Sequence, residues 1–229
     1  MSDVESATDW TEAGRKLFAG PCDFFFAAAK SDGLPPVGPP EVAFAGRSNV
    51  GKSSLVNALT GRSGLARASH TPGRTQELIF FDLHGKATLV DMPGYGYAAV
   101  AKSKSASWGR LIHDYLRGRP SLLRVFLLVD GRHGLKDSDH ETMRMLDAAA
   151  VSYAVVLTKG DEVKPSDRSA RVTATLEGLR KHVAAYPEVM LTSARTREGI
   201  VELRAHIARL LAERTGGASI TEARPSVDS

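Results

Sequence analysis

The sequence predicts an α/β protein whose mainly parallel sheet is covered by helices on both faces. Short β-branched and aromatic runs alternate along the chain with segments whose apolar residues recur at helical spacing. The longest aliphatic runs, "VFLLV" and "AVVL", have the length of buried strands and are too short to span a bilayer. With 42% hydrophobic and 24% charged residues, the composition is that of an ordinary globular protein.

Six segments are predicted to be strands. The second and third are separated only by "HG", so we expect them to pair as an antiparallel hairpin. The other connections are long enough to hold helices, which makes the rest of the sheet parallel. The predicted strands span residues 41–45, 77–83, 86–91, 124–130, 152–158 and 189–194.

Helical periodicity fills most of the gaps between these strands. One helix begins at Lys52, and the others are expected near residues 108–116, 138–150, 172–186 and 200–210. In such sheets, ligands bind beyond the carboxyl ends of the strands. Polar motifs at those ends are therefore the first candidates for function.

Composition changes divide the chain into three parts. Residues 31–40, "SDGLPPVGPP", cannot continue a helix and indicate a linker. We therefore expect an N-terminal helical extension with its linker over 1–39, the main domain over 40–212, and a flexible tail over 213–229. The aromatic run Phe24–Phe26 is expected to pack on the main domain, with partner binding as the alternative.

Bulk features narrow the functional class. The single cysteine, Cys22, excludes an internal disulfide and fits a reducing compartment. The N-terminus is polar and acidic, unlike a signal peptide. We therefore expect a cytoplasmic protein that does not enter a membrane.

Basic residues gather in two stretches, although the formal net charge is only +4. No acidic residue lies from Gly46 to Gln76, which suits either a phosphate site or a polyanion footprint. From Tyr95 to Arg124 the only acid is Asp114, and an external anion is favoured there because no nucleotide contact is evident. The basic residues of this second stretch are Lys102, Lys104, Arg110, Arg117, Arg119 and Arg124.

The segment "GRSNVGKSS", which starts at Gly46, matches the P-loop pattern in full. Its glycines let backbone N–H groups converge on phosphate oxygens, and the following helix presents its positive end. Lys52 can reach the β- and γ-phosphates, and Ser53 can ligate Mg²⁺. A glycine turn without a ligand is the alternative, and the strand–loop–helix context argues against it.

Asp91 ends a predicted strand and opens the segment "DMPGYGYA". A carboxylate there can hold Mg²⁺ through water, and the N–H of Gly94 can meet the γ-phosphate. Ras-like switches follow this glycine with a glutamine that orients the attacking water. Here the position is Tyr95, which cannot do that work in the same way.

Two further motifs follow later strands. In "TKGD", the Asp161 carboxylate can accept hydrogen bonds from guanine N1–H and from the 2-amino group, neither of which adenine offers. Lys159 can lie over the base and brace the P-loop. The backbone of "TSA", from Thr192 to Ala194, can present an N–H to guanine O6. In the loop "TPGRT", Thr71 and Thr75 both qualify by residue type as a Mg²⁺ ligand.

Taken in order, "GRSNVGKSS", "TPGRTQ", "DMPGYGYA", "TKGD" and "TSA" resemble the EngB (YihA/YsxC) family of P-loop GTPases, which are related to TrmE, Era, EngA and septins. The likeness covers roughly residues 41–211 and includes "RHGLKDSD" at 132–139. It implies the doubly wound G-domain fold, binding of GTP and Mg²⁺, and a role in assembly of the large ribosomal subunit and in normal division and septation.

The resemblance also assigns site residues. It implies Ser53 and Thr75 as the Mg²⁺ ligands. Two departures from the general GTPase pattern stand out, because Thr158 replaces the usual Asn and Tyr95 replaces the hydrolytic glutamine. The implied nucleotide contacts are Gly46, Arg47, Ser48, Asn49, Val50, Gly51, Lys52, Ser53, Gly73, Arg74, Thr75, Gln76, Glu77, Asp91, Met92, Pro93, Gly94, Thr158, Lys159, Gly160, Asp161, Thr192, Ser193 and Ala194.

We therefore expect a monomeric GTPase with low intrinsic activity that binds GTP or GDP and a precursor of the large ribosomal subunit, both rRNA and ribosomal proteins. Lys52 and Asn49 are the candidate catalytic residues. GTPases with a similar glutamine gap often use a P-loop asparagine to hold K⁺, and the alternative is that Asn49 only shapes the loop. The competing function is a ribosome-binding module controlled by guanine nucleotide, with incidental hydrolysis. An ATP-dependent kinase lacks a supporting acceptor motif.

Overall fold

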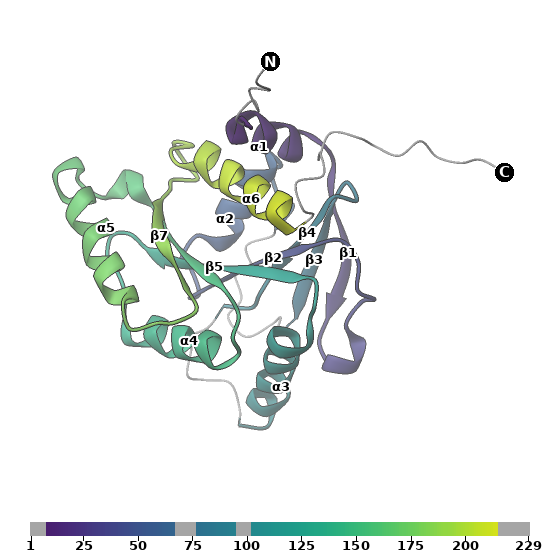
Figure 1. Ribbon diagram of the computed structural model, residues 1–229. Helices are drawn as coiled ribbons and strands as arrows, with labels where there is room; N and C mark the ends of the chain where they lie inside the picture. Colours follow the sequence, from purple (N-terminus) through teal and green to yellow (C-terminus); the bar gives the residue numbers. More distant parts are fainter. Residues whose placement is uncertain (1–7, 67–76, 95–101, 215–229) are drawn as a thin grey trace, which may run out of the picture.

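The computed structural model describes residues 8–66, 77–94 and 102–214, with the side chains of 102–108 left out. One seven-stranded sheet runs through it, in the order β1-β3-β4-β2-β5-β6-β7 (Figure 1). Strands β2, β4, β5, β6 and β7 are parallel neighbours, whereas β3 is antiparallel to both β4 and β1. The strands are β1 Cys22–Ala28, β2 Glu41–Gly46, β3 Leu78–Leu83, β4 Ala87–Asp91, β5 Leu122–Asp130, β6 Tyr153–Thr158 and β7 Ala185–Leu191.

Helices cover both faces of this sheet, as predicted. Two short 3₁₀ turns, Ser31–Gly33 and Gly160–Glu162, complete the regular structure. The fold is that of a doubly wound α/β domain, and the predicted hairpin is the β3–β4 pair. The helices are α1 Trp10–Ala19, α2 Lys52–Thr60, α3 Lys102–Gly118, α4 Asp137–Ala148, α5 Pro165–Leu179 and α6 Ile200–Arg214.

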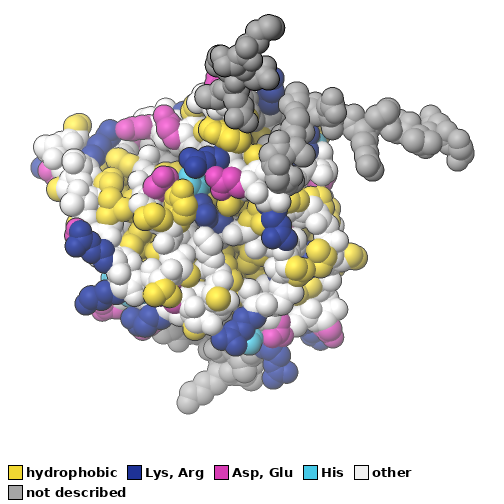
Figure 2. All heavy atoms as spheres, viewed as in Figure 1, with side chains coloured by type: hydrophobic (Ala, Val, Ile, Leu, Met, Phe, Trp, Pro, Cys, Tyr) yellow, Lys and Arg dark blue, Asp and Glu magenta, His cyan; other side chains and the backbone are white. Residues whose placement is uncertain are grey.

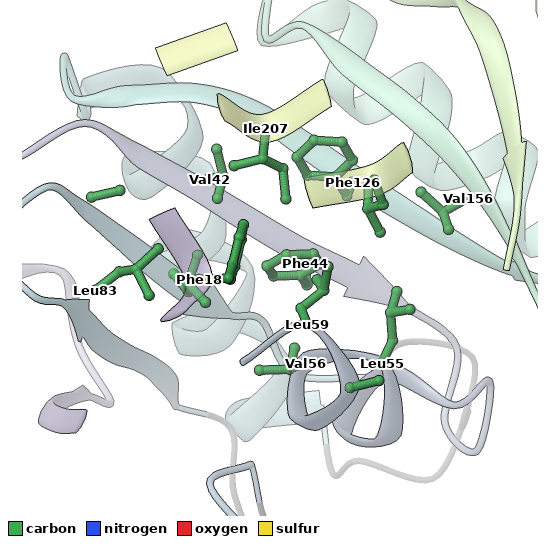
Figure 3. Packing of buried hydrophobic residues seen from close by; sticks show 14 of the residues in the cluster. Phe18, Val42, Phe44, Leu55, Val56, Leu59, Leu83, Phe126, Val156 and Ile207 are labelled. Atoms are coloured by element: carbon green, nitrogen blue, oxygen red, sulfur yellow. The ribbon is translucent and has the colours of Figure 1, made fainter. Parts of the chain in front are cut away.

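Two apolar layers hold the helices on the sheet. One layer joins α1, α2 and α6 to one face, and the other joins α3, α4 and α5 to the opposite face. In the first layer, Phe44 and Phe126 stack with their ring centroids 5.6 Å apart, and Ile207 of α6 lies over them (Figure 3). Phe44 belongs to β2, which leads into the P-loop, and Phe126 belongs to its neighbour β5, so the core fixes the strands that carry the predicted site.

The expectation of six strands was one too few, because the N-terminal segment contains an edge strand as well as a helix. Strand β1 pairs antiparallel with β3, with a bulge between Phe24 and Phe26. The run "CDFFFAA" lacks a clean alternation, since Cys22 and Ala28 are buried whereas Phe24 and Phe25 are 58% and 46% exposed. Only part of the expected aromatic patch therefore packs inward, and backbone pairing attaches the segment.

Helix α1 closes one side of the same unit. The Asp9 carboxylate caps it by accepting from the backbone N–H groups of Thr11 at 3.0 Å and Glu12 at 3.2 Å. Leu17 and Phe18 are buried in the layer shared with α6. The first described residues are thus tied to the last helix of the domain.

The boundary between α5 and β7 also differs from the prediction. The helix expected through residue 186 ends at Leu179, and the strand expected over 189–194 covers 185–191. The Asp147 side chain explains the early turn, because its oxygens accept from Ala184 N–H at 3.0 Å and lie 2.7 Å from His182 Nδ1. Among the described residues, no helix combines the length and apolar character needed to cross a bilayer.

Candidate nucleotide-binding site

The P-loop connects the buried end of β2 to the start of α2. A Cβ at Gly46 would lie 2.8 Å from a methyl group of Val50, and Gly51 has a φ of 103°, so both positions require glycine. Asn49 also has a left-handed φ of 63°, a conformation that asparagine tolerates better than most residues. No side chain caps the N-terminus of α2, so its first N–H groups are free to meet an anion.

The lysine and the aspartate predicted to face the phosphates lie in direct contact. Lys52 Nζ forms an ion pair with Asp91 Oδ1, and the two side chains are only 13% and 14% exposed. Asp91 ends β4 in register with Phe44 of β2, and the neighbouring Met92 N–H donates to the Phe44 carbonyl at 3.0 Å. The sheet register therefore brings the DxxG motif to the P-loop.

The next residues of this motif follow the P-loop closely. A Cβ at Gly94 would lie 3.0 Å from Ser48 Oγ and 3.2 Å from its backbone nitrogen, so any larger residue would have to displace Ser48 by a few tenths of an ångström. The Met92 side chain is 4% exposed and packs in the core. Only the backbone of Met92 is thus available to a nucleotide.

The first residue of "TKGD" braces the P-loop from the neighbouring strand. Thr158 is 4% exposed, and its hydroxyl donates to the carbonyl of Val50 at 2.6 Å. A hydroxyl has one proton, so this side chain has none left to donate to guanine N7. Thr158, which stands where most GTPases have asparagine, therefore makes a contact with the P-loop but cannot donate a hydrogen bond to the base.

The lysine of the same motif spans the P-loop and β5. Lys159 Nζ donates to the Asn49 carbonyl and to Asp130 Oδ2, each at 2.9 Å. The predicted brace between Lys159 and the P-loop is confirmed by this contact. The backbone of Lys159 is left-handed, with a φ of 56°.

The carboxylate predicted to recognise guanine is oriented by the loop that follows β7. Ser193 Oγ donates to Asp161 Oδ1 at 2.5 Å, and Arg195 Nε donates to Oδ2 at 2.7 Å. The hydrogen bond from Ser193, helped by Arg195, lowers the pKa of Asp161 below its ordinary value, so the group is ionised at neutral pH. The Asp161 side chain is 8% exposed, whereas that of Arg195 is 75% exposed.

The "TSA" residues pack tightly beneath this carboxylate. Thr192 and Ser193 are fully buried, and the Thr192 carbonyl accepts from the N–H of Gly160 at 2.9 Å. The predicted contact with guanine O6 would therefore involve the backbone of this segment, at Ala194. The two loops are held together by their own hydrogen bonds.

A cleft of about 580 Å³ opens between these loops and α2. Its size falls within the range of small-molecule sites. Its lining combines the P-loop helix with both base-recognition loops. The lining residues are Gly51, Ser54, Leu55, Asn57, Ala58, Gly61, Arg62, Ser63, Thr158, Lys159, Asp161, Glu162, Thr192, Ala194, Arg195 and Arg197.

Two side chains next to the P-loop lysine offer oxygen ligands that suit Mg²⁺. Ser53 offers a hydroxyl in the first turn of α2, and Asp91 brings a carboxylate to its neighbour Lys52. Hard oxygen donors of this kind are the ligands that Mg²⁺ prefers. The described residues contain no group of three or more His, Cys, Asp or Glu side chains arranged as a metal site.

Some predicted residues lie outside the described part of the chain. These are Gly73, Arg74, Thr75 and Gln76 of the predicted switch, together with Tyr95. Glu77 is described and directly precedes β3.

The structure also identifies residues that the sequence analysis missed. Asp130 binds Lys159, and Asn57 anchors the chain after α2 by exchanging hydrogen bonds of 2.9 and 3.1 Å with the backbone of Ala66. Arg197 and Arg204 donate to the last carbonyls of α2. Asp130 could have been found, because it ends a predicted strand at the same edge as Asp91.

The second basic stretch is smaller at the surface than the sequence indicated. Arg119 is buried in an ion pair with Glu41 at 2.6 Å, and Arg124 is 8% exposed with its guanidinium 4.0 Å from the Tyr186 ring centroid. Arg110 and Arg117 remain exposed on α3. Among the described side chains of this stretch, the exposed basic ones therefore lie on α3.

Known proteins resemble this chain over most of its length. Residues 41–159 match a family described as "50S ribosome-binding GTPase". The chain is 61% identical over 206 residues to a probable GTP-binding protein EngB of Rhodopseudomonas palustris strain BisA53, covering 89% of this chain and 95% of that protein. It is 60% identical over 206 residues to the protein of the same name from Bradyrhizobium diazoefficiens, with the same coverage.

Solved structures support the fold. The crystal structure of a probable GTP-binding protein engB is similar with a TM-score of 0.59 at 24% identity, covering 76% of this chain and all of that one. Era in complex with MgGDPNP and nucleotides 1506–1542 of 16S ribosomal RNA is similar with a TM-score of 0.57 at 21% identity, covering 84% and 60%.

Proposed function

The chain belongs to the EngB family of P-loop GTPases, and on this basis we propose that it acts as a GTP-dependent switch in assembly of the large ribosomal subunit. The proposal that the protein binds GTP is supported by the convergence of three motifs at one edge of the sheet. Asp91 meets Lys52, Thr158 and Lys159 hold P-loop carbonyls, and the oriented Asp161 lies in the cleft.

The proposed roles follow from the chemistry of each group. The N–H groups of the P-loop and Lys52 bind the phosphates, which places a preformed positive region where negative charge increases during hydrolysis. Ser53 and Thr75 are the proposed Mg²⁺ ligands, with Asp91 acting through water. A Mg²⁺ ion held by these residues would supply positive charge that offsets part of the phosphate charge.

Base selection is assigned to Asp161. Its ionised carboxylate offers two acceptors, which match the two donors on the Watson–Crick edge of guanine. Adenine would leave this carboxylate desolvated and without a partner, which carries a large penalty. Ser193 acts as a positioning residue because it fixes the carboxylate without facing the cleft itself.

We propose that hydrolysis by the isolated protein is slow, because Tyr95 stands where other switches have glutamine. Asn49 is the proposed ligand for K⁺ beside the β- and γ-phosphates, and it shares the catalytic role with Lys52. Its side chain is exposed and makes no hydrogen bond with another described residue, whereas its carbonyl is bound by Lys159. The left-handed backbone is the competing reason for an asparagine at this position.

The ribosomal part of the proposal rests on the family description and on the basic surface of α3. Figure 2 shows a few Lys and Arg side chains at the lower end of the face drawn there, where α3 lies in Figure 1, with His and acidic side chains beside them. Such a surface suits the phosphates of rRNA in a precursor of the large subunit, alongside ribosomal proteins. We further propose a monomeric cytoplasmic protein, needed for normal division and septation, with the division into residues 1–39, 40–212 and 213–229 given above.

The competing proposal is a ribosome-binding module that guanine nucleotide controls and whose hydrolysis is incidental. Single-turnover GTP hydrolysis, measured with and without precursors of the large subunit, separates the two. A switch should hydrolyse GTP faster on the precursor and leave it in the GDP form. An unchanged rate, with binding that still depends on GTP, would favour the module.

A further inference from the structure

Asp130 occupies the centre of the nucleotide-facing edge without belonging to any of the motifs described above. It is the last residue of β5 and pairs in register with Thr158 of β6. On the other side of β5 lies β2, whose Gly46 opens the P-loop and pairs with Leu128. Because β5 lies between β2 and β6, Asp130 sits between the phosphate-binding and base-binding loops, and its side chain is 16% exposed.

Both oxygens of this carboxylate are held by cations. Arg132 Nε donates to Oδ1 at 2.9 Å and its Nη2 donates to Oδ2 at 2.8 Å, which forms a two-point fork. The Arg132 backbone N–H adds a bond of 3.1 Å to Oδ1. Burial alone would raise the pKa of Asp130, but the hydrogen bonds from Arg132 and Lys159 hold it well below its ordinary value.

Lys159 is fixed at both ends by this arrangement. Its backbone is in the left-handed region, which an L-residue adopts only at some cost. Its ammonium is shared between Asp130 Oδ2 and the Asn49 carbonyl. The stem between these two ends lines the cleft, where a planar base can pack against it.

We propose that Asp130, oriented by Arg132, is a positioning residue that holds Lys159 in its nucleotide-binding conformation. A free lysine has many rotamers, and fixing one of them before the ligand arrives removes that entropy loss from the binding step. Asp130 acts through Lys159 and does not touch the phosphates. This inference rests on the proposed nucleotide site.

A positioning role and a purely structural role of Asp130 predict different effects of its substitution on nucleotide affinity. If Asp130 acts through the Lys159 ammonium, its substitution matters only while that ammonium is present. Loss of one charge-assisted contact corresponds to about tenfold in affinity. The loss should be the same for GDP and GTP, because the γ-phosphate is not involved.

A double-mutant cycle with Asp130→Asn and Lys159→Met tests whether the effect of Asp130 depends on the Lys159 ammonium. The measurement is the dissociation constant of GDP and of GTP at fixed salt, by calorimetry, with thermal unfolding recorded for each variant. We expect Asp130→Asn to weaken both nucleotides about tenfold in the wild-type background and less than twofold in the Lys159→Met background. An equal loss in both backgrounds, or no loss in the wild-type background, overturns the proposal.

Arg132→Gln provides a second variant that does not depend on replacing a buried group. Without the fork the carboxylate can rotate, so we expect a smaller loss, about threefold, which again disappears with Lys159→Met. Arg209→Gln is the matched control, because Arg209 is an exposed arginine of α6 that binds Glu213 at 2.9 Å outside the cleft, and its substitution should leave affinity unchanged. A loss with Arg132→Gln that persists in Lys159→Met also overturns the proposal. A wild-type protein that binds neither GDP nor GTP would instead refute the proposed function.

Discussion

Replacing Asp161 by asparagine should change which purine nucleotide the protein binds. The carboxylate is the proposed acceptor for guanine N1–H and for the 2-amino group, and its 8% exposure leaves little room for water to replace it. Hydrogen bonds to a charged group contribute roughly 1.5–3 kcal/mol each. The substitution turns one of the two contacts into a clash between donors and removes the charge from the other, so the full value of both, about 3–6 kcal/mol, is the upper limit of the loss. At 1.4 kcal/mol per decade, Asp161→Asn should weaken GDP by up to roughly two to four orders of magnitude.

The same substitution should improve the binding of xanthine nucleotides. The asparagine amide carries an N–H donor where the carboxylate had an acceptor, and xanthine has an oxygen where guanine has its amino group. Competition of GDP and xanthosine diphosphate against a fluorescent nucleotide gives both affinities. Arg195→Gln is the matched control, because it removes the exposed partner of Asp161 and keeps the carboxylate. A variant Asp161→Asn that still prefers GDP would refute the assignment of the base site.

Three other substitutions test the remaining parts of the site. Lys52→Ala should weaken GTP by about one to two orders of magnitude, because a charge-assisted contact contributes roughly 1.5–3 kcal/mol; unchanged affinity in a folded variant would contradict the P-loop assignment. Neutralising Lys102, Lys104, Arg110 and Arg117 together should flatten the salt dependence of binding to the ribosomal precursor while GTP binding persists, and a wild-type slope would move the footprint elsewhere. Wild-type GTP hydrolysis should be faster in K⁺ than in Na⁺. Asn49→Ala should abolish that difference without weakening the affinity for GDP, and Tyr95→Ala should change the hydrolysis rate little. Equal wild-type rates in both salts, with and without ribosomes, would exclude the K⁺ proposal.

Much of the fold could be predicted because its strands are apolar runs bounded by clear turn signals. The hairpin of β3 and β4 and the parallel strands from β2 to β7 follow from period and spacing alone. Strand β1 was missed because an edge strand buries only some of its side chains, and "FFF" shows no alternation. The end of α5 was missed because the turn depends on Asp147, which lies 35 residues before His182.

The site shows the same division between local and non-local information. Motifs with a fixed spacing, such as the P-loop, place their residues reliably because the chemistry is contained in one loop. The burial of Arg119 and Arg124 could not be read from sequence, since their partners Glu41 and His206 are 78 and 82 residues away. A count of basic residues therefore overestimated the external surface.

Two adjacent residues of "TKGD" bind two adjacent carbonyls of the P-loop, and this pairing joins base recognition to phosphate recognition. Thr158 binds the Val50 carbonyl, and Lys159 binds that of Asn49. A displacement of either loop therefore disturbs both halves of the nucleotide. Because the single proton of Thr158 is committed to this brace, the donor that an asparagine could give to guanine N7 is missing, and selection of the base depends on Asp161 to a correspondingly greater degree. That dependence is the reason to expect a loss toward the upper end of the range for Asp161→Asn.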